Sequence, residues 1–334
     1  MRLRRLLPVI VLLGGLAGLL AWLALTPAPA LEAGPLVVEI PAHEGILGIA
    51  DRLGRAGVIR SRAAFVAGGA VRGNMRRLKA GEYDIPRGAT TVDILELLES
   101  GRVRQHMVLH PEGATISELA RVLESERLAS ADDVVKAAAS ERLRQALGVE
   151  GPSLEGYLFP DTYQFVRGMS VDEMLTRMVQ RMRGKLTPEV LERAREHGLS
   201  VHQLLTLASI IEREAVDPAE QKLISAVFWN RLRRDMPLQA DPTVQYAVAK
   251  ERRALTRADL ASDHPYNTYV HRGLPPGPIA SPGVGAIEAA LDPAPVKYLY
   301  FVARSAEDRR HHFSTSVAEH NAAVARYRLS RRQL

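Results

Sequence analysis

Residues 207–215 read LASIIEREA, an apolar stretch that carries two acids, Glu212 and Glu214. At about 100° per residue, a helix over residues 203–215 gathers its apolar side chains into one stripe. That stripe consists of Leu204, Ala208, Ile211 and Ala215, with Leu207 at its flank. Glu214 falls within about 20° of Leu207 on this wheel, and Glu212 falls on the opposite flank. The stretch therefore predicts a half-buried helix with an acid on each edge.

These two acids have two interpretations, and helix geometry does not choose between Glu212 and Glu214. In the first interpretation, each acid is a solvated residue beside a core stripe. In the second, one of them is a general acid, because a carboxyl against apolar walls loses hydration in its charged form and holds its proton more tightly. Such an acid can donate a proton to a leaving oxygen near neutral pH and then take one back.

The composition is that of a folded protein with room for two or more domains, since 46% of the 334 residues are hydrophobic and 25% are charged. The net charge of +6 allows an anionic neighbour such as nucleic acid, anionic lipid or an anionic polymer. The arginines are scattered, without the aromatic-interleaved basic patch that single-stranded nucleic acid needs, so no nucleic-acid partner is expected. The absence of cysteine excludes disulfides, thiolate metal sites and cysteine nucleophiles.

The amino-terminal end predicts a membrane anchor. Residues 6–25, LLPVIVLLGGLAGLLAWLAL, contain no charge and can span a bilayer as a transmembrane helix. Residues 1–5, MRLRR, form a cytoplasmic tail by the positive-inside rule, and residues 26–35 form a Pro- and Ala-rich linker. A cleaved signal peptide with a small-residue site at 28–30 is the alternative. Both interpretations place the rest of the chain outside the cytoplasm.

Residues 36–104 predict a small module of a strand, two helices and a second strand, followed by a third helix. The expected elements are strands at Leu36–Ile40 and Gly81–Ile85 and helices at 46–53, 62–72 and 91–98. This β-α-α-β order resembles a LysM-like module, a fold associated with binding N-acetylated glycans. A small packing module without a ligand is the alternative.

Residues 105–334 predict a helix-rich domain. Apolar residues recur three and four positions apart over 116–124, 131–147, 171–181, 188–196, 202–215 and 218–233. Beyond residue 235, Pro and Gly become dense, and LYFVA at 299–303 is an expected strand. The fold class expected for the whole chain is α+β, with helices dominant and short β-sheets in both parts.

Three stretches outside the acidic helix carry polar and aromatic side chains that suit a sugar. They are SLEGYLFPDTYQF at 153–165, LQADPTVQYA at 238–247 and HPYNTYVHRGLPPGPIASPG at 264–283. Sugars offer C–H faces for aromatic stacking and hydroxyl and acetamido groups for hydrogen bonds. The candidate substrate-binding residues in these stretches are Glu155, Gln239, Asp241, Thr243, Tyr246, Asn267 and Tyr269. For each loop the alternative is that it only braces the fold.

Several segments, in order, resemble the endolytic murein transglycosylases of the YceG-like (MltG) family. They are LASIIEREA, VFWNRLRRDMPLQADPTVQYA, YNTYVHRGLPPGPIASPG, YLYFVA and HFSTSVAEHN. The amino-terminal anchor, the LysM-like part and EGYLFPDTY fit the same pattern, so the resemblance covers nearly the whole chain. It implies a single-pass inner-membrane enzyme, without a cofactor, that cuts peptidoglycan glycan strands internally on the periplasmic side. It also implies peptidoglycan synthases (penicillin-binding proteins) as partners.

By this resemblance the catalytic residue is Glu214, the second acid of IIERE. The implied reaction uses no water. Protonated Glu214 gives its proton to the oxygen between N-acetylmuramic acid and N-acetylglucosamine, and the C6 hydroxyl of the same sugar closes a 1,6-anhydro ring. The break would release or terminate newly made strands. Asp241 and Glu155 are expected to orient substrate or loops. Family members often have Thr where this chain has Ala215, which puts in doubt only one hydrogen bond to Glu214.

Two other activities stay open at this point. Ordinary glycosidases use a pair of carboxylates, so Asp241 or Glu155 as a true second acid would make the chain a hydrolase with reducing-end products. A membrane-tethered glycan-binding scaffold without catalysis is the other alternative. No metal site is expected at His311, His312 and His320, because adjacent residues of a strand point to opposite faces.

Overall fold

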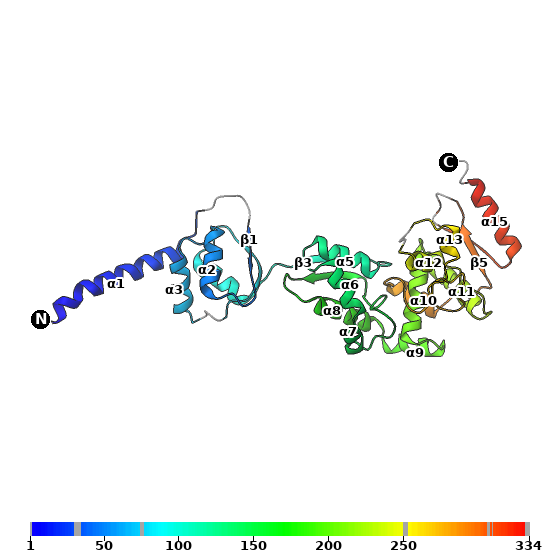
Figure 1. Ribbon diagram of the computed structural model, residues 1–334, viewed down its shortest axis with the longest axis horizontal. Helices are drawn as coiled ribbons and strands as arrows, with labels where there is room; N and C mark the ends of the chain where they lie inside the picture. Colours follow the sequence, from blue (N-terminus) through cyan, green and yellow to red (C-terminus); the bar gives the residue numbers. More distant parts are fainter. Residues whose placement is uncertain are drawn as a thin grey trace. The chain divides into compact units, whose positions relative to one another are not determined.

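The computed structural model describes residues 2–29, 35–73, 77–249, 253–305, 308 and 310–330, with side chains described from residue 9 onward. The chain forms two compact units, and Figure 1 labels many of their elements. The first unit is Met1–Met107 with Gln164–Met169, and the second is Val108–Tyr163 with Ser170–Leu334. The sequence did not predict the return of 164–169 to the first unit.

The first unit has the predicted order of strand, two helices and strand. Strands β1 (Leu36–Ile40) and β2 (Gly81–Ile85) pair antiparallel, with the ends of one strand opposite the ends of the other. The helices are α2 (Ile46–Arg55), α3 (Arg62–Val71) and α4 (Thr91–Ser100). Phe65, Tyr83 and Leu95 are fully buried in one core with both strands. Helix α4 ends where Gly101 takes a left-handed conformation, φ 72°, which glycine adopts without strain.

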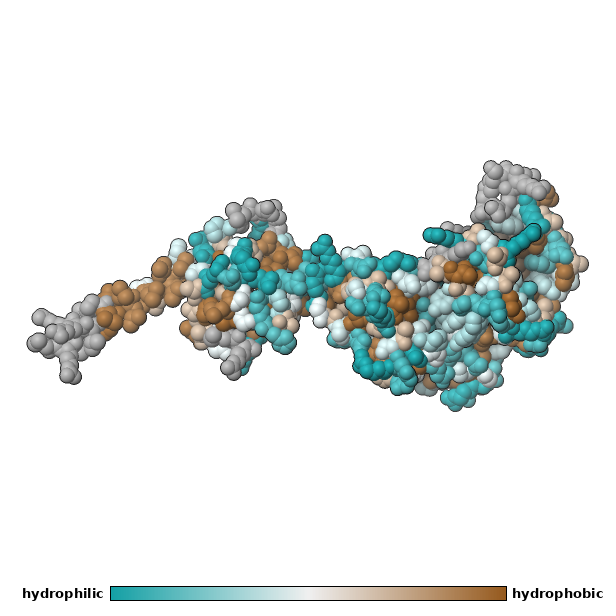
Figure 2. Space-filling model, in the orientation of Figure 1, coloured by the Kyte–Doolittle hydropathy of each residue, from teal (hydrophilic) through white to brown (hydrophobic). Residues whose placement is uncertain are grey.

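Helix α1 (Arg2–Leu25) contains the predicted apolar stretch 6–25. Most of its large apolar side chains from Val9 to Leu25 are exposed, and the helix is brown along this part in Figure 2. Among the residues that the structure describes, no helix combines the length and the apolarity needed to cross a membrane. Residues 6–8 of the predicted span lie outside the described side chains, and residues 30–34 of the predicted linker lie outside the described residues.

The second unit consists mainly of helices, as predicted. They are α5 (Ile116–Ser125), α6 (Ala131–Ala139), α7 (Glu141–Ala146), α8 (Val171–Lys185), α9 (Pro188–Glu196), α10 (Val201–Glu214), α11 (Gln221–Leu232), α12 (Asp241–Ala247), α13 (Arg257–Leu260), α14 (Val284–Leu291) and α15 (Val317–Ser330). Helix α10 packs against α9, α11, α12 and α14. Every residue from Leu204 to Ile211 is buried. The single apolar stripe predicted for this helix was therefore too narrow, because neighbours cover it on all sides.

The strands form short two-stranded sheets, which confirms the coarse α+β prediction. Across the described ranges the pairs are β1–β2, β3 (His106–His110) with β4 (Asp161–Phe165), and β5 (Tyr300–Ala303) with β6 (His311–Ser314). The β5–β6 pair is antiparallel and includes most of the predicted strand 299–303. Helices outnumber strands throughout, so the positions of the site residues are set mainly by helix packing.

The single helix predicted over 131–147 is two helices in the structure. Ser140 separates them, because its backbone is extended and its hydroxyl accepts a hydrogen bond from the N–H of Leu143 at the start of α7. The apolar spacing continues across Ser140 and therefore predicted one helix. Similarly, the predicted helix 218–233 begins with a 3-10 turn, η1 (Pro218–Glu220), before α11.

Candidate active site

Glu214 is the last residue of α10, and the chain becomes extended at Ala215. The residue is half-buried, so its neighbours shelter part of it from water. No donor among the described residues hydrogen-bonds this carboxyl. A helix also carries partial negative charge at its C-terminal end. This position is therefore unfavourable for a carboxylate anion.

The electrostatic surroundings keep Glu214 protonated. Loss of hydration, followed by the negative charge of Asp241, raises the pKa of Glu214 to about 8. Arg213 and Arg231 act in the opposite direction, but burial is the larger effect. A carboxyl with this pKa holds its proton at pH 7, so Glu214 can act there as a general acid.

Glu212, two residues earlier, has a structural partner. Its Oε2 accepts a hydrogen bond from the backbone N–H of Gly283 at 3.1 Å, and Gly283 is the N-cap of α14. Burial and the neighbouring Glu112 raise the pKa of Glu212, and the Gly283 N–H opposes that shift. The two acids that the helical wheel could not separate thus differ in surroundings: Glu212 holds the start of another helix, and Glu214 does not.

The Pro- and Gly-rich loop at residues 276–283 runs along α10 and is bound to it at three places. The contacts are His202 Nε2–H to Pro276 O at 2.7 Å, Ile279 N–H to Ser209 Oγ at 3.0 Å, and Gly283 N–H to Glu212 Oε2 at 3.1 Å. They are spread from the first turn of the helix to its last. The helix that carries Glu214 and this loop therefore form one continuous piece of structure.

Asp241 and Tyr269 form a hydrogen-bonded pair next to Glu214. The Tyr269 hydroxyl donates to Asp241 Oδ1 at 2.6 Å. Asp241 is exposed at the start of α12, and its charge acts on Glu214. Burial, the hydrogen bond to Asp241 and the charges of Asp241 and Glu214 all raise the pKa of Tyr269. Its hydroxyl therefore keeps its proton and holds the Asp241 carboxyl in place.

Gln239 has a backbone conformation that is uncommon for a residue with a side chain, with φ 48°. Its N–H donates to Thr268 O at 3.0 Å, and its Oε1 accepts from Nη1 of Arg231 at 3.1 Å. The side chain is exposed overall, which leaves its amide N–H₂ toward solvent. Two contacts thus fix the turn that leads into Asp241.

Two of the predicted substrate-binding residues are fully buried and bonded within the protein. The Thr243 hydroxyl donates to Ala240 O at 2.7 Å and lies 2.9 Å from the Thr268 hydroxyl. The Asn267 amide donates to Leu260 O and Ser262 O, and its oxygen accepts from Tyr269 N–H at 2.9 Å. These bonds occupy the polar groups of both side chains and fix the loop segments that carry Asp241 and Tyr269.

Glu155 and Tyr246 form a second group, with Tyr266. Both oxygens of Glu155 accept from the backbone N–H of Ile116, the first residue of α5, at 3.2 Å. The charge of Glu155 acts on both tyrosines, whose rings lie 5.0 Å apart, and burial is the main reason that the pKa of each is raised. This carboxyl is nearly fully buried and caps a helix.

Comparison with known proteins places the chain in a family. The model of the YceG-like family matches residues 38–326. The chain belongs to the YceG-like family. It is 35% identical over 306 residues to the endolytic murein transglycosylase of Bacillus subtilis, a match that covers 87% of this chain and 84% of that protein. The endolytic murein transglycosylase of Streptococcus pneumoniae is 32% identical, and the match covers 87% of this chain and 58% of that protein.

A solved structure supports the same family. The 2.6 Å crystal structure of a YceG-like protein from Listeria monocytogenes is 34% identical to this chain. It matches with a TM-score of 0.60, over 86% of this chain and 98% of the other. The similarity thus extends over both compact units of this YceG-like chain.

Arg231 contacts Gln239 in this YceG-like chain, and the sequence analysis did not single it out. It stands in the quoted segment VFWNRLRRDMPLQADPTVQYA, where three arginines in four residues suggest a solvated surface. It is nevertheless buried on the inner face of α11, four residues after Val227 and seven after Ile224. The same wheel that gave the stripe of α10 would have placed Arg231 on the apolar face.

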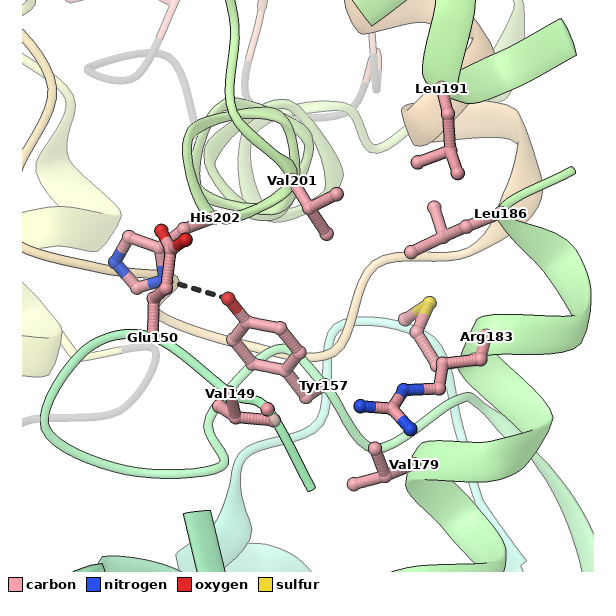
Figure 3. Close-up of a pocket in the computed structure, with 11 residues that line it drawn as sticks. Val149, Glu150, Tyr157, Val179, Arg183, Leu186, Leu191, Val201 and His202 are labelled. Carbon is pink, nitrogen blue, oxygen red and sulfur yellow. Dashed lines mark hydrogen bonds between the residues drawn. The ribbon is translucent and has the colours of Figure 1, made fainter. Parts of the chain in front are cut away.

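A separate pocket of about 350 Å³ lies at the other end of α10 (Figure 3). Its apolar lining includes Val149, Val179, Leu186, Leu191 and Val201. At one side the Tyr157 hydroxyl donates to His202 Nδ1 at 2.9 Å, the dashed line in Figure 3. Nδ1 is the acceptor, because Nε2–H donates to the carbonyl of Pro276. This pair holds the loop and is remote from Glu214 along the helix.

The three histidines near the carboxyl end have separate surroundings. His311 lies in β6, where its N–H and Nδ1 contact the carboxylate of Glu220, with Nδ1 to Oε2 at 2.8 Å. His312 is exposed on the same strand. His320, in α15, stacks on Tyr300 with ring centroids 5.2 Å apart. The partners of His311 and His320 thus give these two side chains hydrogen-bonding and packing roles.

Proposed function

We propose that this YceG-like chain is an endolytic peptidoglycan lytic transglycosylase, which cleaves between N-acetylmuramic acid and N-acetylglucosamine without water. The observation that carries the proposal is the acid at the end of α10. Burial raises the pKa of Glu214 to about 8, and no described donor bonds its carboxyl. The names of the Bacillus and Streptococcus relatives support murein as the substrate.

In this reaction one acid serves two steps. Glu214 donates its proton to the glycosidic oxygen as the bond from that oxygen to C1 of N-acetylmuramic acid breaks. The carboxylate that remains takes the proton of the C6 hydroxyl of the same sugar, whose oxygen bonds to C1. The strand then ends in a 1,6-anhydro ring, and Glu214 regains its starting proton. The break would release or terminate newly made strands.

The other predicted residues divide into two roles. Asp241, held by Tyr269, faces Glu214 and supports its protonated form, and the exposed amide of Gln239 is placed to meet a sugar. Thr243 and Asn267 position the segments that carry them, because their polar groups are already bonded. Tyr246 and Glu155 form a neighbouring wall, where we propose that the tyrosine ring contacts sugar and Glu155 fixes α5.

Hydrolysis is the second candidate function, and Asp241 is the observation that favours it. An exposed carboxylate whose charge acts on Glu214 could activate a water, as the second carboxylate of an inverting or retaining glycosidase does. The strands would then end in ordinary reducing sugars. The hydrogen bond from Tyr269 argues for the positioning role, since it occupies one oxygen of this carboxylate.

We propose that α1 anchors the chain in the inner membrane, with residues 1–5 in the cytoplasm and the chain after Leu25 on the periplasmic side. The exposed apolar side chains between Val9 and Leu25 support this location. Synthases that make the glycan strands are the proposed protein partners, since an enzyme that trims new strands works where they emerge. Fractionation of cells that express the full chain tests the anchor: release by high salt or carbonate would contradict it.

We also propose that the β-α-α-β module is LysM-like and assists in holding glycan. A groove of about 510 Å³ between α2 and α3 supports a search there, and it is lined by Leu47, Ala50, Asp51, Arg62, Ala63, Val66, Ala67 and Ala70. Titration of the full chain with N-acetylglucosamine oligomers, followed by NMR shifts of α2 and α3 amides, tests the module apart from cleavage. The absence of saturable shifts in α2 and α3 would leave it a packing module.

The decisive experiment identifies the new chain ends. The full chain in detergent micelles is incubated with uncrosslinked glycan strands, and the products are analysed by mass spectrometry with Glu214→Gln as the inactive control. Anhydro ends, lighter than reducing ends by one water, support the transglycosylase. Reducing ends would instead support a hydrolase in which Asp241 is the second carboxylate. Intact strands that stay bound to the protein would favour a glycan-binding scaffold without catalysis.

A further inference from the structure

The pocket in Figure 3 combines an apolar lining with charged groups. Its volume of about 350 Å³ falls within the range of about 300–1,000 Å³ that small-ligand sites occupy. Val149, Val179 and Met182 are buried parts of the lining. All of its lining residues belong to the second unit, and they meet α10 at its first turn, whereas Glu214 is the last residue of that helix. The pocket is therefore a candidate site of its own.

Two opposite charges, Glu150 and Arg183, line this pocket, and both residues are exposed. Glu150 follows α7, and Arg183 lies in the last turn of α8. In the view of Figure 3 they lie on opposite sides of Tyr157. Within the described residues, neither forms an ion pair with the other or with a third group. A ligand in the pocket would thus meet one carboxylate and one cation that no partner neutralises.

The backbone holds the guanidinium of Arg183 in place. Its Nη2 donates to the carbonyl of Leu147, where α7 ends. Gly148, next in sequence, has φ 51°, and a Cβ there would lie 3.3 Å from the same Nη2. A residue with a side chain at 148 would be strained and would crowd the guanidinium. One carbonyl uses one N–H of Arg183, so the other N–H groups can receive a carboxylate.

The polar groups of the pocket wall already have partners. The Tyr157 hydroxyl donates to His202 Nδ1 at 2.9 Å, and His202 Nε2–H donates to Pro276 O at 2.7 Å. Gly151 and Gly277 make room for this imidazole, because a Cβ on them would lie 2.4 Å and 3.1 Å from its Cε1. The tyrosine proton and both ring nitrogens are thus used. The hydroxyl-rich surface of a sugar is a poor match for this wall, and an apolar group suits it.

We propose that this pocket binds a short peptide that carries an ammonium group, a carboxylate and an apolar side chain between them. The ammonium group meets Glu150, the carboxylate meets the guanidinium of Arg183, and the apolar side chain packs on the lining. Such a peptide can be free in solution or attached to a glycan strand. The site is separate from Glu214, so it stands whether or not the chain cleaves glycan.

The test is a titration of the full chain in detergent micelles with the dipeptide alanyl-leucine. Valine methyl groups are labelled with ¹³C, and the signals of Val179 and Val201 are assigned by their loss in Val179→Ile and Val201→Ile. We expect saturable shifts of both signals, with a Kd on the order of 1 mM. N-acetylated and C-amidated alanyl-leucine each lack one charge, and each should bind about fivefold more weakly or worse. These measurements use the wild type, so they do not depend on the folding of a charge variant.

Glu150→Gln and Arg183→Gln test the two contacts one at a time. Glu150→Gln should abolish the loss of affinity caused by acetylation and keep that caused by amidation, and Arg183→Gln should do the reverse. Glu196→Gln, at an exposed position of α9 outside the lining, is the matched control and should keep both losses. The proposal is wrong if alanyl-leucine causes no saturable shift, if its blocked forms bind equally well, or if both losses persist in the two variants.

Glycan strands with and without their peptides distinguish the two sources of the ligand. The titration uses Glu214→Gln, so that the strands stay intact. Shifts of Val179 and Val201 with peptide-bearing strands alone would identify the strand as the source. Shifts with neither kind of strand would leave a free peptide as the ligand. Equal shifts with peptide-free strands would mean that the pocket binds sugar, which would overturn the proposal.

Discussion

The carboxyls of Glu214 and Glu155 lie at opposite ends of two helices. Glu155 accepts hydrogen bonds from the first N–H of α5, where the helix is partially positive. Glu214 is the last residue of α10, where the helix is partially negative, and no described donor bonds it. The difference shows how one residue type has two uses. Beside a helix N-terminus a carboxyl meets free N–H donors, whereas burial at the C-terminal end of α10 raises the pKa of Glu214.

The largest expected effect concerns Glu214, the proposed catalytic acid. Glu214→Gln should fold normally and lose strand cleavage by about 10³-fold or more, because an amide cannot donate the proton. Glu212→Gln is the matched control, since it lies two residues away and its oxygen can still accept from Gly283. The measurement is the rate of new chain ends by mass spectrometry. Similar losses in both variants would contradict the assignment of Glu214.

The second prediction concerns the dependence of stability on pH. The pKa of Glu214 is raised from an ordinary 4.5 to about 8, so the folded protein binds this proton more tightly than the unfolded chain does. Its contribution to the free energy of unfolding is complete below about pH 4.5 and is lost as pH rises through 8. The slope for one proton is about 1.4 kcal/mol per pH unit.

We therefore expect Glu214→Gln to lose less stability than the wild type between pH 5 and 9. Thermal melts of both proteins across that range measure the difference. Cleavage by the wild type should also decline above about pH 8, where the acid loses its proton. Parallel melting curves for the two proteins would mean that Glu214 is an ordinary surface carboxyl.

A smaller effect is expected when the neighbour of Glu214 is neutralised. Asp241→Asn removes a negative charge, so the pKa of Glu214 should fall and the alkaline limit of activity should move down by about one unit. The pH profile of kcat/KM measures this shift. Asp235→Asn, at an exposed position before α12, is the control and should leave the limit unchanged. Anhydro products from Asp241→Asn would also argue against a hydrolytic pair.

The smallest effect on activity is expected for Glu155, the other carboxyl of the comparison. Glu155→Gln weakens two hydrogen bonds to Ile116 and removes a charge from a helix N-terminus. The free energy of unfolding should fall by about 1–3 kcal/mol, while the pH limit of cleavage stays near that of the wild type. Urea unfolding and the pH profile test the two parts. A displaced pH limit would mean that Glu155 belongs to the chemistry.

Much of the fold could be predicted from local patterns. Strands β1 and β2, the end of α4 at Gly101 and the apolar run of α10 all follow from spacing and from glycine. The break at Ser140 could not, since the apolar spacing continues while a side-chain cap starts a new helix. Nor could the burial of α10 on all sides, which depends on how α9, α11, α12 and α14 pack around it.

The site was predicted in part. The motif indicated Glu214, but periodicity alone could not separate it from Glu212, because their difference lies in the Gly283 N–H from a distant loop. Thr243 and Asn267 have the residue types of sugar contacts, and only their tertiary hydrogen bonds give them bracing roles. Arg231 was missed because it lies in sequence beside two other arginines, which suggests an exposed position. In the structure it lies on the buried face of α11.

The three bonds between α10 and the loop 276–283 have a consequence for how this region can change in length. The loop is hydrogen-bonded to the helix at His202, Ser209 and Glu212, so the number of loop residues between these bonds must match the spacing of their partners on α10. An insertion or deletion of one residue in the loop would move at least one of these three hydrogen-bonding groups away from its partner. Tolerated length changes should therefore fall outside residues 276–283.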